Sequence, residues 1–255
     1  MSVLDIRDVS HNFGGLVAIS GLNMTLQDHE LVGVIGPNGA GKTTVFNLIS
    51  GVYRPSQGSI IFEGREIAGR SPSAITNLGV ARTFQNIRLF KELSVLDNVR
   101  IAHYGQARYS AMEALFHTGR FSKEEESIVA HSMELLDLLK LESAADEQAK
   151  NLPYGLQRRV EIARALATRP KLLLLDEPAA GMNPHEIDQL MDLIRWIRDR
   201  FSLTILLIEH QMALVMAICE RLLVLDFGET IAEGKPEEIQ NDRRVLEAYL
   251  GEVDA

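Results

Sequence analysis

The sequence predicts an α/β fold with a mostly parallel core sheet, an antiparallel N-terminal β subdomain and an inserted helical subdomain. Uninterrupted apolar segments of strand length recur along the chain, and each leads through a loop into a helical pattern, as parallel strands buried on both faces do. The N-terminal segments alternate or end in turn residues, which is typical of antiparallel strands. From about residue 86 to 168 the pattern is mainly helical. We therefore expect one domain over residues 1–255, with 86–168 as an insertion.

Five segments are predicted strands. GLNMTLQ (21–27) and GSIIFEG (58–64) have the antiparallel pattern. LVGVI (31–35), KLLLLD (171–176) and LTILLI (203–208) are the buried parallel strands. In an open sheet of this kind, ligands bind at the carboxyl ends of the parallel strands.

Composition limits the class of protein. The chain has 255 residues, 46% of them hydrophobic and 24% charged, which excludes a disordered or fibrous chain. The net charge is −9, and basic residues are dispersed except for Arg158, Arg159 and Arg164. We expect no nucleic-acid partner, because neutralising phosphates requires a basic stripe.

The sequence contains no apolar run of the roughly 18 residues that span a bilayer, and its N-terminus does not resemble a secretory signal. We therefore expect any membrane role to depend on a partner. Cys219 is the only cysteine and lies in an apolar run. A packed core thiol in a reducing compartment is the favoured interpretation.

The segment GPNGAGKTT, residues 36–44, follows LVGVI and precedes the helical run VFNLIS. It satisfies the phosphate-loop pattern G-x-x-x-x-G-K-[ST] in the context that the pattern requires, which disfavours a simple glycine-rich turn. Lys42 can supply a charge to the β and γ phosphates, and the Thr43 hydroxyl can bind Mg²⁺. The glycines that let backbone N–H groups turn toward phosphates are Gly36, Gly39 and Gly41.

Polar residues at other strand ends are candidates for the second half of the site. Asp176 ends a buried strand and can hold Mg²⁺ through water, and the adjacent Glu177 can polarise a hydrolytic water. His210 ends the next strand, where a γ-phosphate contact is favoured over a structural role. Gln85 in ARTFQN ends another candidate strand, and its side-chain amide could sense the metal and the water. These strand ends should meet at one edge of the sheet.

Together these motifs resemble the nucleotide-binding subunits of ATP-binding cassette (ABC) transporters. GPNGAGKTT resembles the family's phosphate loop, TFQN its glutamine loop, LLLLDEP its magnesium strand with the catalytic glutamate, and IEH its switch histidine. The resemblance extends from about Val3 to Glu252 and implies ATP and Mg²⁺ as cofactors. It implies catalytic roles for Lys42, Gln85, Glu177 and His210. It places Mg²⁺ at Thr43, Gln85 and Asp176, and the phosphates at Gly36, Asn38, Gly39, Ala40, Gly41, Lys42, Thr43 and Thr44. Phe13 in HNFGG matches the family's aromatic position that stacks on adenine.

The segment LPYGLQRR resembles the family's signature, whose helix points at a nucleotide held by a second cassette. The implied contacts are Leu152, Pro153, Tyr154, Gly155 and Gln157. Compared with the usual L-S-G-G-Q, proline replaces serine, tyrosine the first glycine and leucine the glutamine. Proline suits a first helical turn. The lost hydroxyl predicts weaker closure, or closure that depends more on the glycine and the helix dipole; hydrolysis should still occur.

Other motifs narrow the resemblance. VRIAHYGQ, LDEPAAGMNP, IEHQMALVM and VLEAYLGE look like the ATP-binding protein of branched-chain amino-acid importers. This implies a second cassette, identical or related, two membrane permease subunits and, indirectly, a periplasmic or extracellular substrate-binding protein. It implies a peripheral location on the cytoplasmic face of the inner membrane. Asn183 stands where the family usually has aspartate, which we interpret as neutral variation.

Two other functions stay open. One is the ATPase of a lipid or polysaccharide exporter, whose cassettes look similar. The other is a non-transport module that dimerises on ATP, which long coiled-coil arms, a tandem cassette or a basic face would favour; the sequence has none of them. Residues 86–98 could equally form a permease-binding groove or an ordinary core. Residues 103–126 are more typical of a surface elaboration than of a binding site.

Overall fold

The computed structural model describes residues 2–250, and the chain divides into two compact units. The sheet unit contains residues 1–85 and 171–255, and the helical unit contains residues 86–170. The last residues of the predicted C-terminal motif, Gly251 and Glu252, lie outside the described residues.

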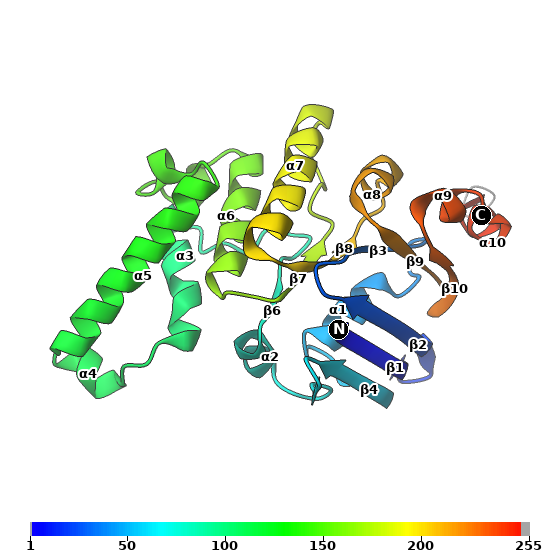
Figure 1. Ribbon diagram of the computed structural model, residues 1–255, viewed down its shortest axis with the longest axis horizontal. Helices are drawn as coiled ribbons and strands as arrows, with labels where there is room; N and C mark the ends of the chain where they lie inside the picture. Colours follow the sequence, from blue (N-terminus) through cyan, green and yellow to red (C-terminus); the bar gives the residue numbers. More distant parts are fainter. Residues whose placement is uncertain (1, 251–255) are drawn as a thin grey trace. The chain divides into compact units, whose positions relative to one another are not determined.

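The sheet unit is built on a six-stranded sheet with the order β10-β9-β3-β8-β7-β6 (Figure 1). Strand β3 pairs in parallel with β8 and β9, and β7 pairs in parallel with β6 and β8, while β10 runs antiparallel to β9. Every residue of β3, β7 and β8 is buried, which confirms the prediction from their apolar runs. The bounds are β3 Leu31–Ile35, β6 Val80–Arg82, β7 Leu172–Asp176, β8 Thr204–Ile208, β9 Arg221–Asp226 and β10 Glu229–Gly234.

A four-stranded antiparallel sheet with the order β2-β1-β4-β5 completes the strands of this unit. The two predicted antiparallel segments lie in β2 and β4, and the predicted fold class is confirmed. The bounds are β1 Ser2–Phe13, β2 Leu16–Gln27, β4 Gln57–Phe62 and β5 Arg65–Glu66.

The core of the sheet unit lies between these two sheets. Helix α1 contributes Val45, Phe46 and Ile49 to a cluster that also contains residues of β1, β4, β7 and β9. In Figure 1, α7 and α8 lie above the parallel strands and α1 below them. Cys219 is buried, as predicted, and burial raises the pKa of its thiol. The bounds are α1 Lys42–Ile49, α2 Pro72–Leu78, α7 Pro184–Phe201, α8 Met212–Ile218, α9 Pro236–Gln240 and α10 Arg243–Leu250.

In the helical unit, α3 packs against both α5 and α6. Its core includes Val99 of α3, Leu136 of α5 and Val160 of α6, all with no exposed surface. None of the helices within residues 2–250 is both long and apolar enough to cross a bilayer. The bounds are α3 Val95–His103, α4 Ala111–Leu115, α5 Gly119–Leu138 and α6 Tyr154–Ala167, with short 3₁₀ turns at Tyr104–Gln106, Glu142–Ala144 and Ala149–Asn151.

Candidate functional site

The phosphate loop connects β3 to α1 through left-handed glycines. Gly36 and Gly41 have φ values of 146° and 104°. A Cβ on Gly36 would lie 2.0 Å from the carbonyl oxygen of Leu225, and a Cβ on Gly41 would lie 2.7 Å from that of Ala18. Only glycine therefore lets the loop pass this closely against β9 and β2.

Lys42 is the first residue of α1, and its side chain folds back onto the loop. The ammonium group donates to the carbonyl oxygens of Gly36 at 2.7 Å and Pro37 at 2.8 Å. Only 8% of the residue is exposed. These bonds fix a positive charge inside the loop.

The other residues predicted in the loop differ in exposure. Asn38, Gly39 and Thr43 are exposed, Thr44 is half-buried and Ala40 is buried. A Cβ on Gly39 would meet no atom within 4 Å, so this part of the loop faces open space. A fixed cation, a helix N-terminus and an exposed hydroxyl lie together here, and such a set of groups fits a polyphosphate with its divalent cation.

The predicted residues Gln85, Glu177 and His210 meet at one carboxylate oxygen. Gln85 Nε2 donates to Oε2 of Glu177 at 2.6 Å, and His210 Nδ1 lies 3.7 Å from the same oxygen. The Glu177 side chain is 16% exposed and that of His210 is 54% exposed. Glu177 also has a φ of 44°, a left-handed conformation that is strained for glutamate. Strained residues of this kind concentrate at functional sites.

Asp176, the last residue of β7, is 3% exposed and forms a buried ion pair. Its Oδ2 accepts from Nη2 of Arg82 at 2.7 Å. Sequence analysis did not identify Arg82 as a site residue. The only signal was its place in ARTFQN, three residues before Gln85, and nothing local indicated a partner 94 positions away.

Glu209 is a second residue that sequence analysis missed. It has no exposed surface, and its carboxylate accepts from the backbone N–H groups of Ala179 at 2.8 Å, His210 at 3.1 Å and Gln211 at 3.4 Å. Burial raises the pKa of Glu209, although these hydrogen bonds oppose the shift. The carboxylate thereby ties the turn that carries His210 to the loop after Glu177.

Phe13, the predicted adenine-stacking residue, lies at the end of β1 and is 44% exposed. Its ring contacts His11 and Tyr53 edge-on, with centroids 4.7 Å and 5.2 Å away. His11 and Tyr53 stack on each other, and His11 Nδ1 donates to the carbonyl oxygen of Arg54 at 3.0 Å. The two supporting rings fix the orientation of Phe13 and leave part of its surface open.

The signature-like segment of the helical unit differs from the expectation at one residue. Helix α6 begins at Tyr154, so Pro153 precedes the helix as its N-cap, with no side-chain hydrogen bond to cap it. Pro153 was expected in the first turn; its φ of −53° and ψ of 150° place it instead in an extended conformation. Pro153 and Tyr154 are exposed, Gly155 is half-buried, and Gln157 donates to the Leu152 carbonyl oxygen at 2.8 Å.

A buried ion pair lies directly behind this helix start. Nη1 of Arg158 donates to Glu161 at 2.6 Å, and the side chains are 0% and 1% exposed. The other end of the guanidinium donates to the Tyr154 hydroxyl at 3.2 Å. Arg164 donates to the Arg88 carbonyl oxygen, and burial lowers the pKa of Arg164. Arg158 and Arg164 therefore have structural contacts inside the helical unit.

The segment before α3 is held by hydrogen bonds and leaves part of its apolar surface exposed. Asn98, which is fully buried, exchanges hydrogen bonds with the backbone of Phe90 at 2.8 and 3.0 Å. Phe90 is 51% exposed and Leu93 is 37% exposed.

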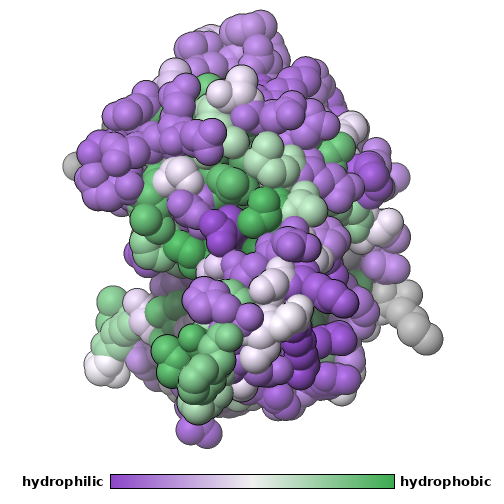
Figure 2. Space-filling view, turned by 90° about the vertical axis from the view of Figure 1, so that its left-hand side faces the viewer, coloured by the Kyte–Doolittle hydropathy of each residue, from purple (hydrophilic) through white to green (hydrophobic). Residues whose placement is uncertain are grey.

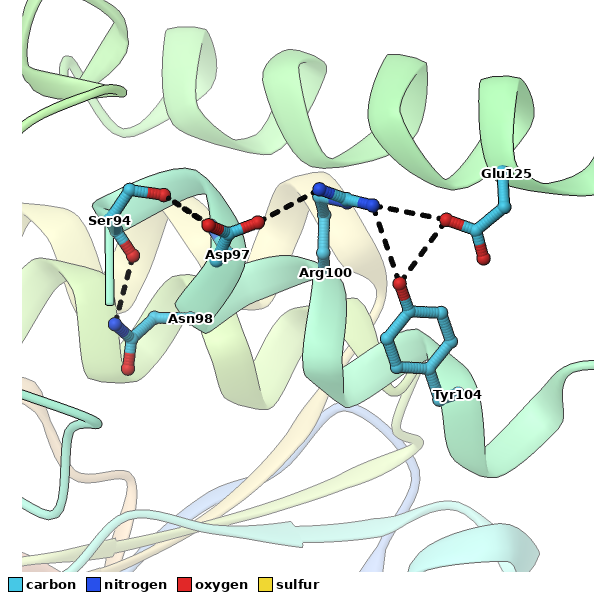
Figure 3. Close-up of polar contacts among 6 residues, drawn as sticks. All are labelled: Ser94, Asp97, Asn98, Arg100, Tyr104 and Glu125. Atoms are coloured by element: carbon cyan, nitrogen blue, oxygen red, sulfur yellow. Dashed lines mark hydrogen bonds and ion pairs between the residues drawn. The ribbon is translucent and has the colours of Figure 1, made fainter. Parts of the chain in front are cut away.

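A polar network surrounds α3. Figure 3 shows how Asn98 donates a hydrogen bond to the Ser94 carbonyl oxygen, and how Arg100 links Asp97 to Tyr104 and Glu125. This network positions the start of α3.

Helix α4 and the residue that caps its C-terminus carry the most exposed apolar side chains of the helical unit. Met112 is 61% exposed, and Leu115 and Phe116 are each 69% exposed. Figure 2 shows hydrophobic surface near the bottom of the face on which α4 lies, and also at its mid-height. Tyr109 and Phe121, from the same predicted surface elaboration, instead pack edge-to-face with centroids 5.0 Å apart.

Comparisons with known proteins identify matching families and relatives. The family described as "ABC transporter" matches residues 19–180, and the family "Branched-chain amino acid ATP-binding cassette transporter" matches residues 229–255. The chain is 43% identical to the high-affinity branched-chain amino acid transport ATP-binding protein BraF of Pseudomonas aeruginosa, over 98% of both chains. The corresponding protein LivG of Escherichia coli is also 43% identical over 98% of both chains.

Solved structures show the same fold. One is the ADP conformation of an ATP-binding cassette of an ABC transporter, with a TM-score of 0.86 and 32% identity over 98% of this chain and 99% of that one. A nucleotide-free ATP-binding cassette has a TM-score of 0.85 and 33% identity over the same shares of the two chains.

Proposed function

Because the chain belongs to the ABC transporter family, we propose that it is the ATP-hydrolysing subunit of a membrane importer for branched-chain amino acids. The observation that carries this proposal is the 43% identity, over 98% of both chains, to ATP-binding proteins of such importers. The chain is an ATPase of this family. The transported amino acid would contact other subunits, so the choice of substrate follows from the relatives.

In this proposal the phosphate loop holds the triphosphate of ATP. Lys42 provides the charge, the loop's backbone and α1 provide N–H groups, and Phe13 stacks on adenine. Among residues 2–250 no cluster of three or more His, Cys, Asp or Glu could hold a metal. Mg²⁺ would therefore depend on Thr43, Gln85, Asp176 and phosphate oxygens. When bound, it would neutralise charge on the β and γ phosphates.

We assign the hydrolytic role to Glu177. Its carboxylate would orient and polarise the attacking water, and Gln85, 2.6 Å away, would hold that carboxylate in place. His210 would contact the γ-phosphate from the adjacent strand end. The convergence of both side chains on one oxygen supports this assignment.

We further propose that residues 86–168 form the inserted signature subdomain and act on a neighbouring cassette. Its contacts with the neighbour's nucleotide would come from the start of α6. The neighbour would be a second copy of this chain or a related chain, and two permease subunits would hold the pair on the cytoplasmic face of the membrane. The exposed Phe90 and Leu93 are suited to contact a permease. The residues of this chain that would contact the neighbour's nucleotide are Leu152, Pro153, Tyr154, Gly155 and Gln157.

The test is ATP hydrolysis and amino-acid uptake by the assembled complex in proteoliposomes. Glu177→Gln should lower both rates by about 10² or more, because it removes the group that polarises water. Glu237→Gln, an exposed carboxylate on α9, is the matched control and should retain both. Equal ATPase rates for the wild type and Glu177→Gln would contradict the assignment of Glu177. Normal ATPase without uptake of leucine, isoleucine or valine would contradict the substrate class.

A further inference from the structure

Arg82, the last residue of β6, is a buried cation to which the proposed function gives no role. Its side chain is only 6% exposed. One end of the guanidinium, Nη2, donates to Oδ2 of Asp176 at 2.7 Å. The other end, Nη1, donates to Oδ1 of Asn47 at 2.7 Å and Oγ of Ser50 at 3.1 Å. The planar guanidinium thus makes contacts in two directions, which a lysine could not reproduce.

These partners belong to the two halves of the nucleotide site. Asp176 ends β7 and is the predicted metal carboxylate, whereas Asn47 lies in α1 and Ser50 caps its C-terminus. Helix α1 begins at the phosphate-loop residue Lys42. Arg82 therefore joins the strand end expected at the metal to the helix expected at the phosphates.

Two aromatic rings enclose the guanidinium. Its central carbon lies 5.5 Å from the centroid of Phe46, in α1, and 5.0 Å from that of Phe84. Contacts with ring faces at these distances favour a cation. Phe84 precedes Gln85, so the rings hold Arg82 between α1 and the glutamine loop.

The contact with Arg82 gives the buried Asp176 carboxylate a cationic partner. The aspartate side chain is 5% exposed, and a buried carboxylate without a cation is strongly destabilised. Arg82 occupies Oδ2, whereas within residues 2–250 no hydrogen bond reaches Oδ1 of Asp176. Asp176 is thus neutralised and oriented on one side and has a second oxygen available for a metal-bound water.

We propose that Arg82 is a positioning residue for the divalent cation: it locks Asp176 to α1 so that the carboxylate presents Oδ1 to the cation that accompanies the phosphates. The inference rests on the proposed function, because it assumes that nucleotide and Mg²⁺ bind at this site. It adds that the metal carboxylate and the phosphate-loop helix are held as one piece by a residue outside the recognised motifs. Arg82 acts through Asp176 and does not itself touch the cation.

The test is the gain in nucleotide affinity that Mg²⁺ provides. Binding of ATP to the full-length protein is measured by calorimetry in EDTA and in Mg²⁺. The dissociation constant in EDTA is divided by the dissociation constant in Mg²⁺, and this ratio is compared between variants. Arg82→Gln should lower this ratio by roughly 10-fold or more, the usual effect of removing a group that orients a metal ligand. Arg82→Lys keeps the positive charge but lacks the planar guanidinium that donates in two directions. Its ratio should therefore lie between those of the wild type and Arg82→Gln. Arg7→Gln, at an exposed ion pair with Asp5, is the control.

A double variant separates positioning from general damage. In an Asp176→Asn background, Arg82→Gln should change the Mg²⁺-dependent ratio no further, because Arg82 acts through Asp176. An unchanged ratio in Arg82→Gln and Arg82→Lys would overturn the inference, as would a further fall in the Asp176→Asn background. If Arg82→Gln does not fold, the same comparison is made with Arg82→Lys. Absence of ATP binding by the wild type would instead contradict the proposed function.

Discussion

The two units of the chain bury charge in different ways. In the sheet unit, Arg82 and Asp176 form an ion pair across 94 positions of sequence, at the end of two adjacent strands. In the helical unit, Arg158 and Glu161 form an ion pair within one turn of α6. The first pair depends on the tertiary fold and lies among predicted site residues. The second is local and lies within the helix that begins at the exposed Tyr154. The comparison teaches that the predicted phosphate-binding and metal-binding residues come together from distant strands, whereas the signature-like segment belongs to one helix.

Removing Arg158 should have the largest effect on stability. Arg158→Met removes the guanidinium that pairs with the buried Glu161 at 2.6 Å, so the free energy of unfolding should fall by about 3 to 5 kcal/mol. The measurement is urea denaturation followed by circular dichroism. Arg120→Met removes an exposed partner of Glu113 and should change stability by less than about 1 kcal/mol. Equal losses of unfolding free energy in the two variants would show that burial does not increase the cost of removing Arg158.

The phosphate loop should be sensitive to a single methyl group. Gly41→Ala combines a φ of 104° with a Cβ 2.7 Å from a backbone oxygen, and it should cost roughly 1 to 3 kcal/mol and abolish ATP binding. Gly39→Ala is the matched control, because its φ is 82° but its Cβ meets nothing within 4 Å. It should cost about 1 kcal/mol, from backbone strain alone. Calorimetric ATP binding that survives in Gly41→Ala would refute the steric argument.

The helical unit should lose stability in mild acid. Burial lowers the pKa of His103, at the end of α3, from 6.5 to about 4, with help from the nearby Arg169 and His131. Between these values the unfolded chain binds a proton that the folded chain does not, so stability falls as pH decreases. The loss is at most about 1.4 kcal/mol per pH unit, and solvent at the ring reduces the total to roughly 1 to 2 kcal/mol.

The measurement for His103 is urea denaturation from pH 7 to pH 4. His103→Gln should flatten the pH dependence, whereas His117→Gln, at an exposed position of the same unit, should leave it unchanged. A pH dependence that persists in His103→Gln would assign the effect to other groups.

The smallest effect is expected at the start of α6. Pro153→Ser supplies an N-cap hydroxyl where the helix has no side-chain cap, and it should stabilise the helical unit by about 1 kcal/mol. The same hydroxyl could reach a neighbour's phosphate, so ATPase activity of the assembled complex should rise. Unchanged stability in denaturation experiments would show that the proline already provides an equivalent helix start.

Much of the sheet unit could be predicted from the sequence because its signals are local. Buried parallel strands are continuous apolar runs, and the phosphate loop combines glycines with a lysine at fixed spacing. Gln85, Glu177 and His210 were found because each follows a strand. The roles of Arg82 and Glu209 could not be found this way, because their partners are distant in sequence or are backbone N–H groups.

The helical unit was predicted less completely. Its helical character was clear, but the sequence did not show that Arg158 is buried while Pro153 and Tyr154 are exposed. An arginine on an amphipathic helix is usually exposed, and only the packing of α6 against α3 and α5 reverses this expectation. Helix boundaries also shift by a residue or two with the cap, which is why Pro153 lies before the helix.

The central claim is that ATP lies between the phosphate loop of one cassette and the signature-like segment of its neighbour. The most direct measurement uses the assembled complex and an ATP analogue with a photoreactive group on the γ-phosphate, with labelled peptides identified by mass spectrometry. We expect labels in both residues 36–44 and residues 152–157 of this chain. Labelling of residues 36–44 without any labelling of residues 152–157 would contradict the account.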